Sequence, residues 1–303
     1  MAASLTILAS GSSGNTALVD CDGERWLIDL GLEPKELDAR LADAGASWSQ
    51  IKGVLITHRH SDHWRPKTLA RCLSSRVPVH CHRDNCPAFR LACPDFRDLE
   101  QARLFRPFVG EKSIPLSVNW QCRPFRVRHD GGATFGFRFE ETAGGNSTHS
   151  LSVCAATPRA FAYVADLGCW DRGVVDRLLD IDLLALEFNH DPELLRNSTR
   201  PPWLIHRILG DEGHLSNAQA AALISETLKH GNSTRLQQLV LLHISHECNS
   251  SDLAAASARA ALEKSGCNAN VFAAEQHQRS PTFVVGAATI AENAGRLVQA
   301  SLF

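Results

Sequence analysis

The sequence lacks long apolar runs, paired-cysteine motifs, internal repeats and low-complexity segments. No stretch of its 303 residues reaches eighteen consecutive apolar positions, so we expect no transmembrane helix. Residues 1–10 have neither a basic region nor a long apolar run, so we expect no secretory signal there. Ten cysteines at irregular spacings, without a Cys-x-x-Cys pair, are typical of buried thiols rather than of a disulfide framework. These absences predict a cytoplasmic protein that makes no membrane contact.

The composition is that of an ordinary globular protein. Hydrophobic residues make up 44% and charged residues 21% of the chain, which is sufficient for a sizeable core. No shift in composition marks a boundary, so we expect residues 1–303 to form a single domain. A polar loop is expected at about residues 140–160, around Gly144-Gly145-Asn146.

Short apolar runs alternate with amphipathic segments along the chain, which indicates an α/β fold. Strands are expected at Leu5–Ala9, Ala17–Asp20, Trp26–Leu30, Val54–Thr57, Val77–Cys81, Phe125–Val127, Phe135–Phe139, Phe161–Ala165, Leu183–Phe188, Leu239–Leu242 and Thr282–Val285. Helices are expected at Pro34–Ala44, from Pro66 onward, at Ser216–His230 and from about Asp252 to Lys264.

Charge is distributed unevenly along the chain. Residues 59–128 contain 14 Lys and Arg against 6 Asp and Glu, a net charge of +8, whereas the whole chain carries −2. Arginine, which suits bidentate phosphate contacts, accounts for 25 of the 31 basic residues. This excess predicts either a polyanionic partner or solvated helix faces without a partner, and the sequence leaves both open.

The most informative segment is His58-Arg59-His60-Ser61-Asp62-His63, at the end of a predicted buried strand. Four residues that can bind a metal lie within six positions. Imidazole nitrogens suit zinc and other borderline divalent ions, and a carboxylate adds charge. Because residues two apart in an extended chain share a face, His58 and His60 can contact one metal. After a bend, Asp62 and His63 can contact a second one.

This segment resembles the His-x-His-x-Asp-His signature of the metallo-β-lactamase superfamily of dinuclear hydrolases. Further residues that the superfamily expects occur in the same order, namely Asp29 on an early strand, His129 in a later loop, Asp166 after a strand and His243 at a last strand end. The resemblance covers nearly the whole chain. It implies a four-layer αββα sandwich.

Within the superfamily, the chain resembles the YycJ (WalJ)-type branch, whose members are described as DNA exonucleases. The resemblance rests on Ala9-Ser10-Gly11-Ser12-Ser13-Gly14-Asn15, Leu186-Glu187-Phe188-Asn189-His190-Asp191, Gly213-His214-Leu215-Ser216-Asn217 and His243-Ile244-Ser245-His246-Glu247-Cys248-Asn249. Ribonuclease Z and the PhnP-type phosphodiesterases are more distant relatives. Cys248 stands where this branch would have Asn, and the loop at about 140–160 is longer than expected. We expect both departures to lie near the substrate.

The resemblance implies two divalent metal ions, zinc or manganese, or else iron. One ion would bind His58, His60, His129 and Asp166, and the other would bind Asp62, His63, Asp166 and His243. Asp166 would therefore bridge the two ions. A hydroxide held between them would attack the phosphorus, while Asp62 orients the attacking water or accepts its proton.

His214 is the candidate acid that protonates the leaving oxygen, and Glu187 would hold its other ring nitrogen. The alternative role for His214 is that of a helix cap. Asp29 is expected to support the metal-binding histidines from behind rather than to bind a metal itself.

Two further segments are candidates for contact with the substrate. His190 would either contact it or support the metal site. In the turn Ser10–Asn15, Ser12 and Asn15 are candidates because glycine-rich turns can present backbone N–H groups to a phosphate. The alternative is a plain tight turn.

The predicted function is hydrolysis of phosphodiesters, as a nuclease for which DNA is favoured over RNA. A small-molecule (cyclic) phosphodiesterase is the alternative. A thioester or lactam hydrolase is less favoured, because it needs neither phosphate-binding arginines nor an acid for the leaving group. No obligate protein partner is evident. Six cysteines and histidines superficially resemble a structural zinc site, namely Cys72, His80, Cys81, His82, Cys86 and Cys93. Their spacings fit no zinc motif, so we expect the cysteines to be buried thiols instead.

Overall fold

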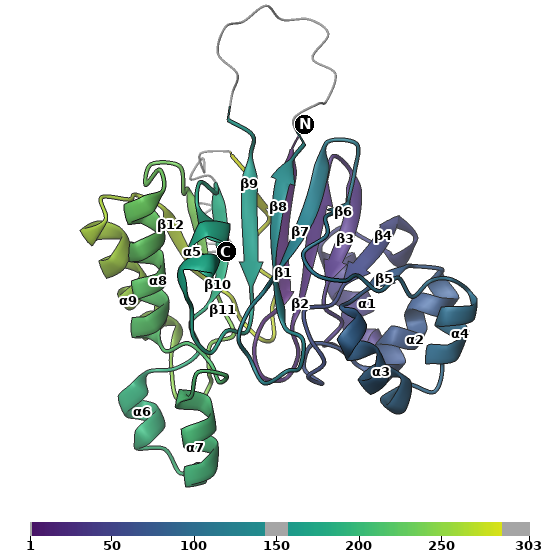
Figure 1. Cartoon of the computed structure of the whole chain (residues 1–303), viewed down its shortest axis with the longest axis horizontal. Helices are drawn as coiled ribbons and strands as arrows, with labels where there is room; N and C mark the ends of the chain where they lie inside the picture. The colour runs from purple at the N-terminus through teal and green to yellow at the C-terminus, as the bar shows by residue number, and fades with distance from the viewer. Residues whose placement is uncertain (1, 143–156, 287–303) are drawn as a thin grey trace, which may run out of the picture.

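Two β-sheets face each other in the computed structural model, which describes residues 2–142 and 157–286 (Figure 1). The strands of the first sheet are β1 (Ala3–Ala9), β2 (Thr16–Cys21), β3 (Glu24–Ile28), β4 (Ile51–Leu55), β5 (Val79–His80) and β13 (Phe283–Val284). Their order is β13-β1-β2-β3-β4-β5. A hairpin turn at Asp22-Gly23 joins β2 to β3, which pair antiparallel.

The second sheet contains seven strands in the order β12-β11-β10-β9-β8-β7-β6. They are β6 (Ile114–Pro115), β7 (Trp120–Arg126), β8 (Phe135–Glu141), β9 (Ala160–Val164), β10 (Leu183–Glu187), β11 (Gln238–Leu242) and β12 (Asn270–Ala273). Strands β9 to β12 run parallel, and β9, β10 and β11 are buried along their whole length. This matches their continuous apolar sequences, because parallel strands are covered on both faces.

Helices cover the outer face of each sheet (Figure 1). The first sheet carries α1 (Pro34–Asp43), α2 (Pro66–Ser75), α3 (Cys86–Ala92) and α4 (Phe96–Gln101). The second sheet carries α5 (Arg172–Leu178), α8 (Asn217–His230) and α9 (Ser251–Lys264). Two short helices, α6 (Pro192–Arg196) and α7 (Pro202–Leu209), project below the sheets instead (Figure 1).

The apolar core forms three layers. Trp120 and Phe137 are buried between the two sheets with Ile7 and Ile28. One further cluster fills the space between the first sheet and its helices, and another lies between the second sheet and α5, α8 and α9. Three apolar layers separate four layers of structure, which confirms the expected αββα sandwich.

Several predicted boundaries are shifted in the structure. β4 ends at Leu55 rather than at Thr57, and β3 ends at Ile28 because Asp29 adopts a left-handed conformation with φ 61°. The short helices α3 to α7 were not expected, since each is too brief for a clear helical period. No helix in the described part of the chain is long and apolar enough to cross a membrane.

The predicted loop at about residues 140–160 largely lies outside the described residues. Thr142 follows β8, and Thr157 precedes β9, at the end of these strands opposite to Asp166. Because β8 and β9 are antiparallel neighbours, the two loop ends lie together at the far edge of the sheet.

The cysteine-rich segment packs as apolar side chains. Cys72, Cys81, Cys86 and Cys93 are free and buried between the first sheet and its helices. Within residues 2–142 and 157–286, none of them belongs to a group able to hold a metal ion.

Candidate metal centre

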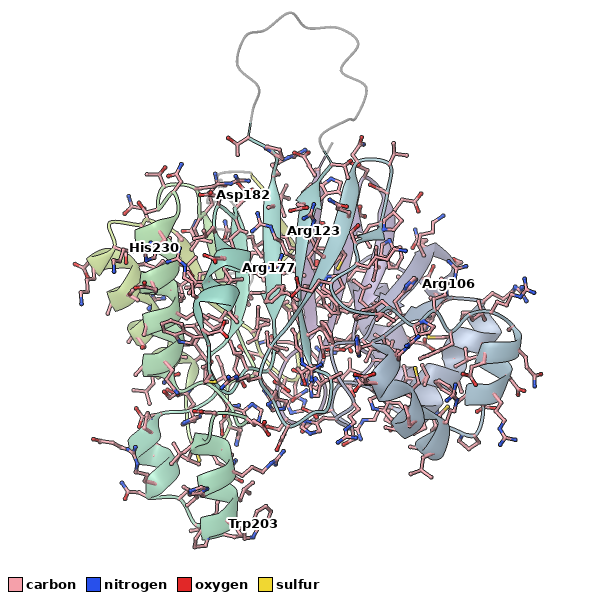
Figure 2. The ribbon with its side chains drawn as sticks, viewed as in Figure 1. Arg106, Arg123, Arg177, Asp182, Trp203 and His230 are labelled. Carbon is pink, nitrogen blue, oxygen red and sulfur yellow. The ribbon has the colours of Figure 1, made fainter. Side chains whose placement is uncertain are left out.

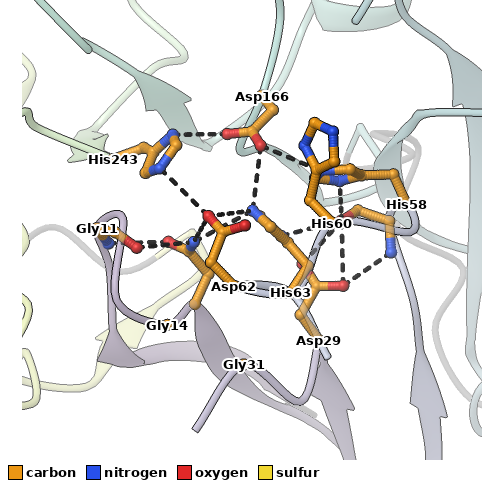
Figure 3. A network of polar contacts seen from close by, with 12 residues as sticks. Gly11, Gly14, Asp29, Gly31, His58, His60, Asp62, His63, Asp166 and His243 are labelled. Atoms are coloured by element: carbon orange, nitrogen blue, oxygen red, sulfur yellow. Dashed lines mark hydrogen bonds and ion pairs between the residues drawn. The ribbon is translucent and has the colours of Figure 1, made fainter. Parts of the chain in front are cut away.

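The candidate residues converge because each follows the carboxyl end of a strand at the same edge of the sandwich (Figure 3). Asp29 follows β3, and the segment 58–63 follows β4. His129, Asp166 and His243 follow β7, β9 and β11 of the other sheet. The centre is therefore built from both sheets, and residues distant in sequence meet there.

The structure places His58, His60, His129 and Asp166 in one group, with one ligand atom of each within 4.8 Å of the others. Nε2 of His58 lies 3.3 Å from Oδ2 of Asp166, and Nε2 of His129 lies 3.6 Å from the same oxygen. Nδ1 of His60 lies 3.2 Å from Nε2 of His129. This set is the one that the sequence predicted for the first metal.

Asp62, His63 and Asp166 form a neighbouring group of the same kind. Nε2 of His63 lies 3.1 Å from Oδ2 of Asp166 and 3.5 Å from Oδ2 of Asp62. Nε2 of His243 lies 3.6 Å from that Asp62 oxygen (Figure 3). Asp166 belongs to both groups, as expected of a bridging carboxylate.

Three of these histidines are oriented by oxygen atoms behind them. The Nδ1 atoms are held as follows: His58 by Oγ1 of Thr57 at 3.0 Å, His63 by Oδ2 of Asp29 at 2.7 Å, and His129 by the carbonyl oxygen of Gly213 at 2.6 Å. A carboxylate or carbonyl oxygen only accepts, so Nδ1 of His63 and of His129 carries the proton. Nε2 of each of these two rings then faces the shared centre, which is the usual arrangement behind a metal-binding histidine.

Two backbone conformations aim side chains into the centre. Asp29 and His243 have φ values of 61° and 51°, in the left-handed region that non-glycine residues seldom adopt. Such strain persists only where the surroundings enforce it. The carboxylate of Asp29 accepts hydrogen bonds from the backbone N–H and the hydroxyl of Thr57, and the backbone N–H of His243 donates to Oγ of Ser10.

Burial keeps several of the imidazoles neutral. It lowers the pKa of His60 to about 4 and holds the pKa values of His58 and His129 below the ordinary histidine value. A neutral imidazole has a free lone pair. These three histidines can therefore bind a metal across the physiological pH range.

The carboxylates of the centre stay ionised although they are buried. Burial alone would raise the pKa of Asp166, but the positive charges of His243 and His63 outweigh it and hold that pKa well below the ordinary value. Conversely, burial opposes the charged form of His63, but Asp166 and Asp62 raise its pKa well above 6.5. Buried carboxylates need a cation beside them. Without a metal, these two histidines supply it.

The donor set fits divalent metal ions. Nε2 of His58 and Nε2 of His243 are buried and have no hydrogen-bond partner in the described part of the chain. Nε2 of His58 faces the ionised Asp166, and Nε2 of His243 faces the ionised Asp62. Imidazole together with carboxylate is a typical ligand set for zinc, manganese or iron. A bound cation would satisfy these nitrogens and the buried negative charge together.

Glu187 and His214 lie next to this centre and form, with Asp166 and His243, a third group whose possible ligand atoms lie within 4.8 Å of one another. Nδ1 of His214 is 2.6 Å from Oε1 of Glu187, whose other carboxylate oxygen accepts the backbone N–H groups of Leu167 and Leu215. Glu187 is fully buried, yet His214 and His243 lower its pKa despite that burial. His214 is partly exposed, and its ring centroid lies 4.8 Å from that of His129.

The remaining sequence candidates take different positions. Asn15 is buried, and its amide Nδ2 lies 3.3 Å from Asp62 and 3.1 Å from Nε2 of His63. Ser12 is exposed and lines an open hollow of about 790 Å³ with residues that follow His243. His190 is buried, and burial lowers its pKa to about 4; neither ring nitrogen has a hydrogen-bond partner in the part of the chain that the structure describes.

Sequence reasoning missed three contributors. Thr57 joins Asp29 to the histidines, and Asp130 lies 3.4 Å from Nε2 of His60 while pairing with Arg207. Asp130 directly follows a predicted ligand in the chain, which was the available signal for it. Thr57 also adjoins the motif. Arg207 lies 77 residues away from Asp130, so no local pattern connects the two.

Only some of the arginines in the basic segment, residues 59–128, lie near the candidate metal centre. Arg126 and Arg128 line an open hollow of about 610 Å³ beside His129. Other arginines of residues 59–128 are paired elsewhere, Arg90 with Glu100 and Arg123 with Glu140. Arg106 and Arg123 lie away from the lower edge of the sandwich (Figure 2). The +8 segment thus combines paired surface charge with a few arginines near the centre.

Comparison with known proteins gives consistent matches. A family model described as the β-lactamase superfamily domain matches residues 24–244. The chain is 29% identical over 263 residues to Exodeoxyribonuclease YycJ of Bacillus anthracis, covering 86% of this chain and 89% of that protein. The metallo-β-lactamase fold protein YhfI from Bacillus subtilis has a similar structure, with a TM-score of 0.61 at 12% identity, covering 94% of this chain and 100% of that one. A diphosphatase from the PhnP family has a TM-score of 0.59 at 16% identity, covering 94% and 98%.

Proposed function

Because this chain belongs to the β-lactamase superfamily domain family, we propose that it is a dinuclear metal-dependent phosphodiesterase that acts as a nuclease on DNA. The superfamily expected from the His-x-His-x-Asp-His segment is confirmed, and with it the expected metal-dependent hydrolase. The named relative from Bacillus anthracis, an exodeoxyribonuclease, supports DNA as the substrate.

One observation carries this proposal beyond the family. The Glu187–His214 pair stands beside the two ligand groups, with Nδ1 of His214 held by the carboxylate and the ring partly open to solvent. Hydrolysis of a phosphodiester releases a sugar hydroxyl, which is a poor leaving group and needs a proton. An imidazole held in this way can deliver that proton from Nε2. A thioester or lactam hydrolase has less need of such an acid.

In this proposal, the residues of the chain have distinct tasks. His58, His60, His129 and Asp166 would hold one divalent ion, and Asp62, His63, Asp166 and His243 would hold the other. When bound, two such ions supply a water of lowered pKa and a clamp for phosphoryl oxygens. Asp62, which is ionised and partly exposed, would accept a hydrogen bond from the attacking water and its proton. Asp29 and Thr57 would hold the histidines in place.

A small-molecule phosphodiesterase is the second candidate. The open hollow of about 610 Å³ beside His129 is large enough for a nucleotide-sized ligand, and the similar structures include a PhnP-family diphosphatase.

A parallel assay on four substrates tests the proposal. Metal-loaded protein is incubated with duplex DNA, single-stranded DNA, RNA and bis(p-nitrophenyl) phosphate. The nuclease proposal expects nucleotide release from DNA together with hydrolysis of the small ester. Hydrolysis of the ester alone would favour the small-molecule phosphodiesterase. No hydrolysis of any of the four would contradict both.

A further inference from the structure

The helical arm formed by α6 and α7 (residues 192–209) extends away from the sheets (Figure 1). It leaves the sandwich after Asp191 and returns shortly before His214. Leu195 and Ile208 are buried against Cys248, and Leu204 and Ile205 pack on the same small cluster. This cluster fixes the arm to the loop that follows His243. The remaining faces of the arm are free to contact a ligand.

Trp203 is the conspicuous residue of this arm. It is 68% exposed and lies at the outer end of the arm (Figure 2). Four other tryptophans, Trp26, Trp48, Trp64 and Trp120, are each no more than 8% exposed. Leu194 and Leu209, also on the arm, are 44% and 36% exposed. Single exposed apolar residues are ordinary, but several on one projecting element indicate a contact surface.

The charge of the arm is positive. Arg196, Arg200 and Arg207 stand against a single acid within the arm, Glu193, and Arg200 also pairs with Glu247 of the neighbouring loop. His206 and Arg207 follow Trp203 by three and four residues, so the three side chains lie on one face of α7. Both are exposed.

This face leads to the metal centre. Arg207 forms an ion pair with Asp130, and Asp130 lies 3.4 Å from Nε2 of His60. Trp203 is one helical turn away, about 6 Å further along the axis. The exposed face of α7 therefore extends outward from the edge of the ligand groups.

We propose that the α6–α7 arm binds the single-stranded end of a DNA substrate, with a base stacked on Trp203 and phosphates contacted by Arg196, Arg200 and His206. This inference rests on the proposed nuclease function. Proteins that bind single strands without sequence preference combine cationic side chains with an aromatic platform, because every base has a π-face. A purely apolar protein partner would gain nothing from the cationic side chains around the tryptophan. A polyanion with aromatic bases uses both.

The test compares W203A and W203F with the unmodified metal-loaded protein. The probe is a 12-nucleotide oligodeoxythymidylate with phosphorothioate linkages, which resists hydrolysis during the measurement. W203A is expected to lower the affinity by about 5- to 100-fold, and W203F, which keeps a ring, to retain most of it. Hydrolysis of bis(p-nitrophenyl) phosphate is expected to stay within twofold of the unmodified rate. L91A is the matched control, because Leu91 is 90% exposed on α3 and no stacking role is proposed for it.

Each outcome separates this inference from the proposed function. Equal affinity of W203A and the unmodified protein, with the small ester still hydrolysed, would overturn the role of the arm and leave the hydrolase intact. Loss of a dimer in W203A by analytical ultracentrifugation, with unchanged DNA affinity, would make the arm a contact between two copies and also overturn the inference. Fluorescence gives an independent measurement. DNA should quench the emission of the unmodified protein but not that of W203F.

Discussion

Nδ1 of His214 lies 2.6 Å from Oε1 of Glu187, and the ionised carboxylate can only accept, so the proton of this hydrogen bond belongs to the imidazole. Nε2 is then the nitrogen that exchanges a proton with a substrate. If His214 protonates the leaving oxygen, H214A should lower DNA hydrolysis by roughly 10²–10⁴-fold. It should barely affect bis(p-nitrophenyl) phosphate, whose nitrophenolate leaves without a proton. Steady-state kinetics on both substrates measure this selectivity.

The control for this prediction is E187Q, which keeps the shape of the side chain. It should show the same selectivity more weakly, because Glu187 only orients the ring. The metal content of both variants should match that of the unmodified protein. Equal losses on both substrates, or loss of metal, would assign His214 to metal binding or to a structural cap.

In the described part of the chain, Asp166 belongs to all three groups of possible ligands, including both groups proposed to hold a metal. D166A should therefore reduce metal content more than H58A does, and elemental analysis of purified proteins should find fewer ions per chain in D166A. The unmodified protein should contain two ions per chain under metal-replete conditions. A single ion per chain would remove the two-metal mechanism.

Asp62 is partly exposed and contacts His63 and His243 but not the apolar core. D62A should lower hydrolysis of both DNA and the small ester by at least about 100-fold, because the water then lacks its orienting carboxylate. The fold should persist, as a circular-dichroism melt would show. D98A, which removes an acid on α4 outside the ligand groups, serves as the matched control. Activity of D62A near that of D98A would show that another residue prepares the water.

His80 should make the protein less stable in mild acid. Burial, aided by Arg106, lowers its pKa to about 4, so between about pH 6.5 and pH 4 the unfolded chain binds a proton that the folded chain does not. The contribution of the neutral ring to the free energy of unfolding is therefore complete above pH 6.5. It falls by about 2–3 kcal/mol as the pH decreases toward 4. His80 lies in β5, outside the ligand groups.

Urea unfolding of the unmodified protein and of H80Q at pH 7 and pH 4.5 checks this prediction. The difference in unfolding free energy between the two proteins should shift in favour of H80Q at the lower pH. A difference that is the same at both pH values would mean that His80 titrates normally in the folded state.

The residues of the candidate metal centre were predictable from sequence because four of them lie in one compact motif and the others follow strand ends. His58, His60, Asp62 and His63 lie within six residues, and Asp166 and His243 each follow an apolar run that reads clearly as a strand. The supporting contacts were harder to predict. Gly213 accepts the hydrogen bond from His129 with its backbone carbonyl oxygen, and every residue type has such an oxygen, so the sequence does not indicate this contact.

The α6–α7 arm and the ends of the loop at about 140–160 could not be placed from the sequence. Helices α6 and α7 have five and eight residues, too few to reveal a period, and their exposed Trp203 looks like a core residue in the sequence. Polarity and length predicted a loop at about 140–160 but carried no information about which ends of β8 and β9 it joins.

The position of Thr142 and Thr157 makes the chain easy to extend without disturbing its chemistry. A five-residue strand such as β9 spans about 17 Å, so an inserted label or a fused reporter domain between these residues would start that far from Asp166. The same junction offers an attachment point for immobilising the enzyme with the candidate metal centre facing solution.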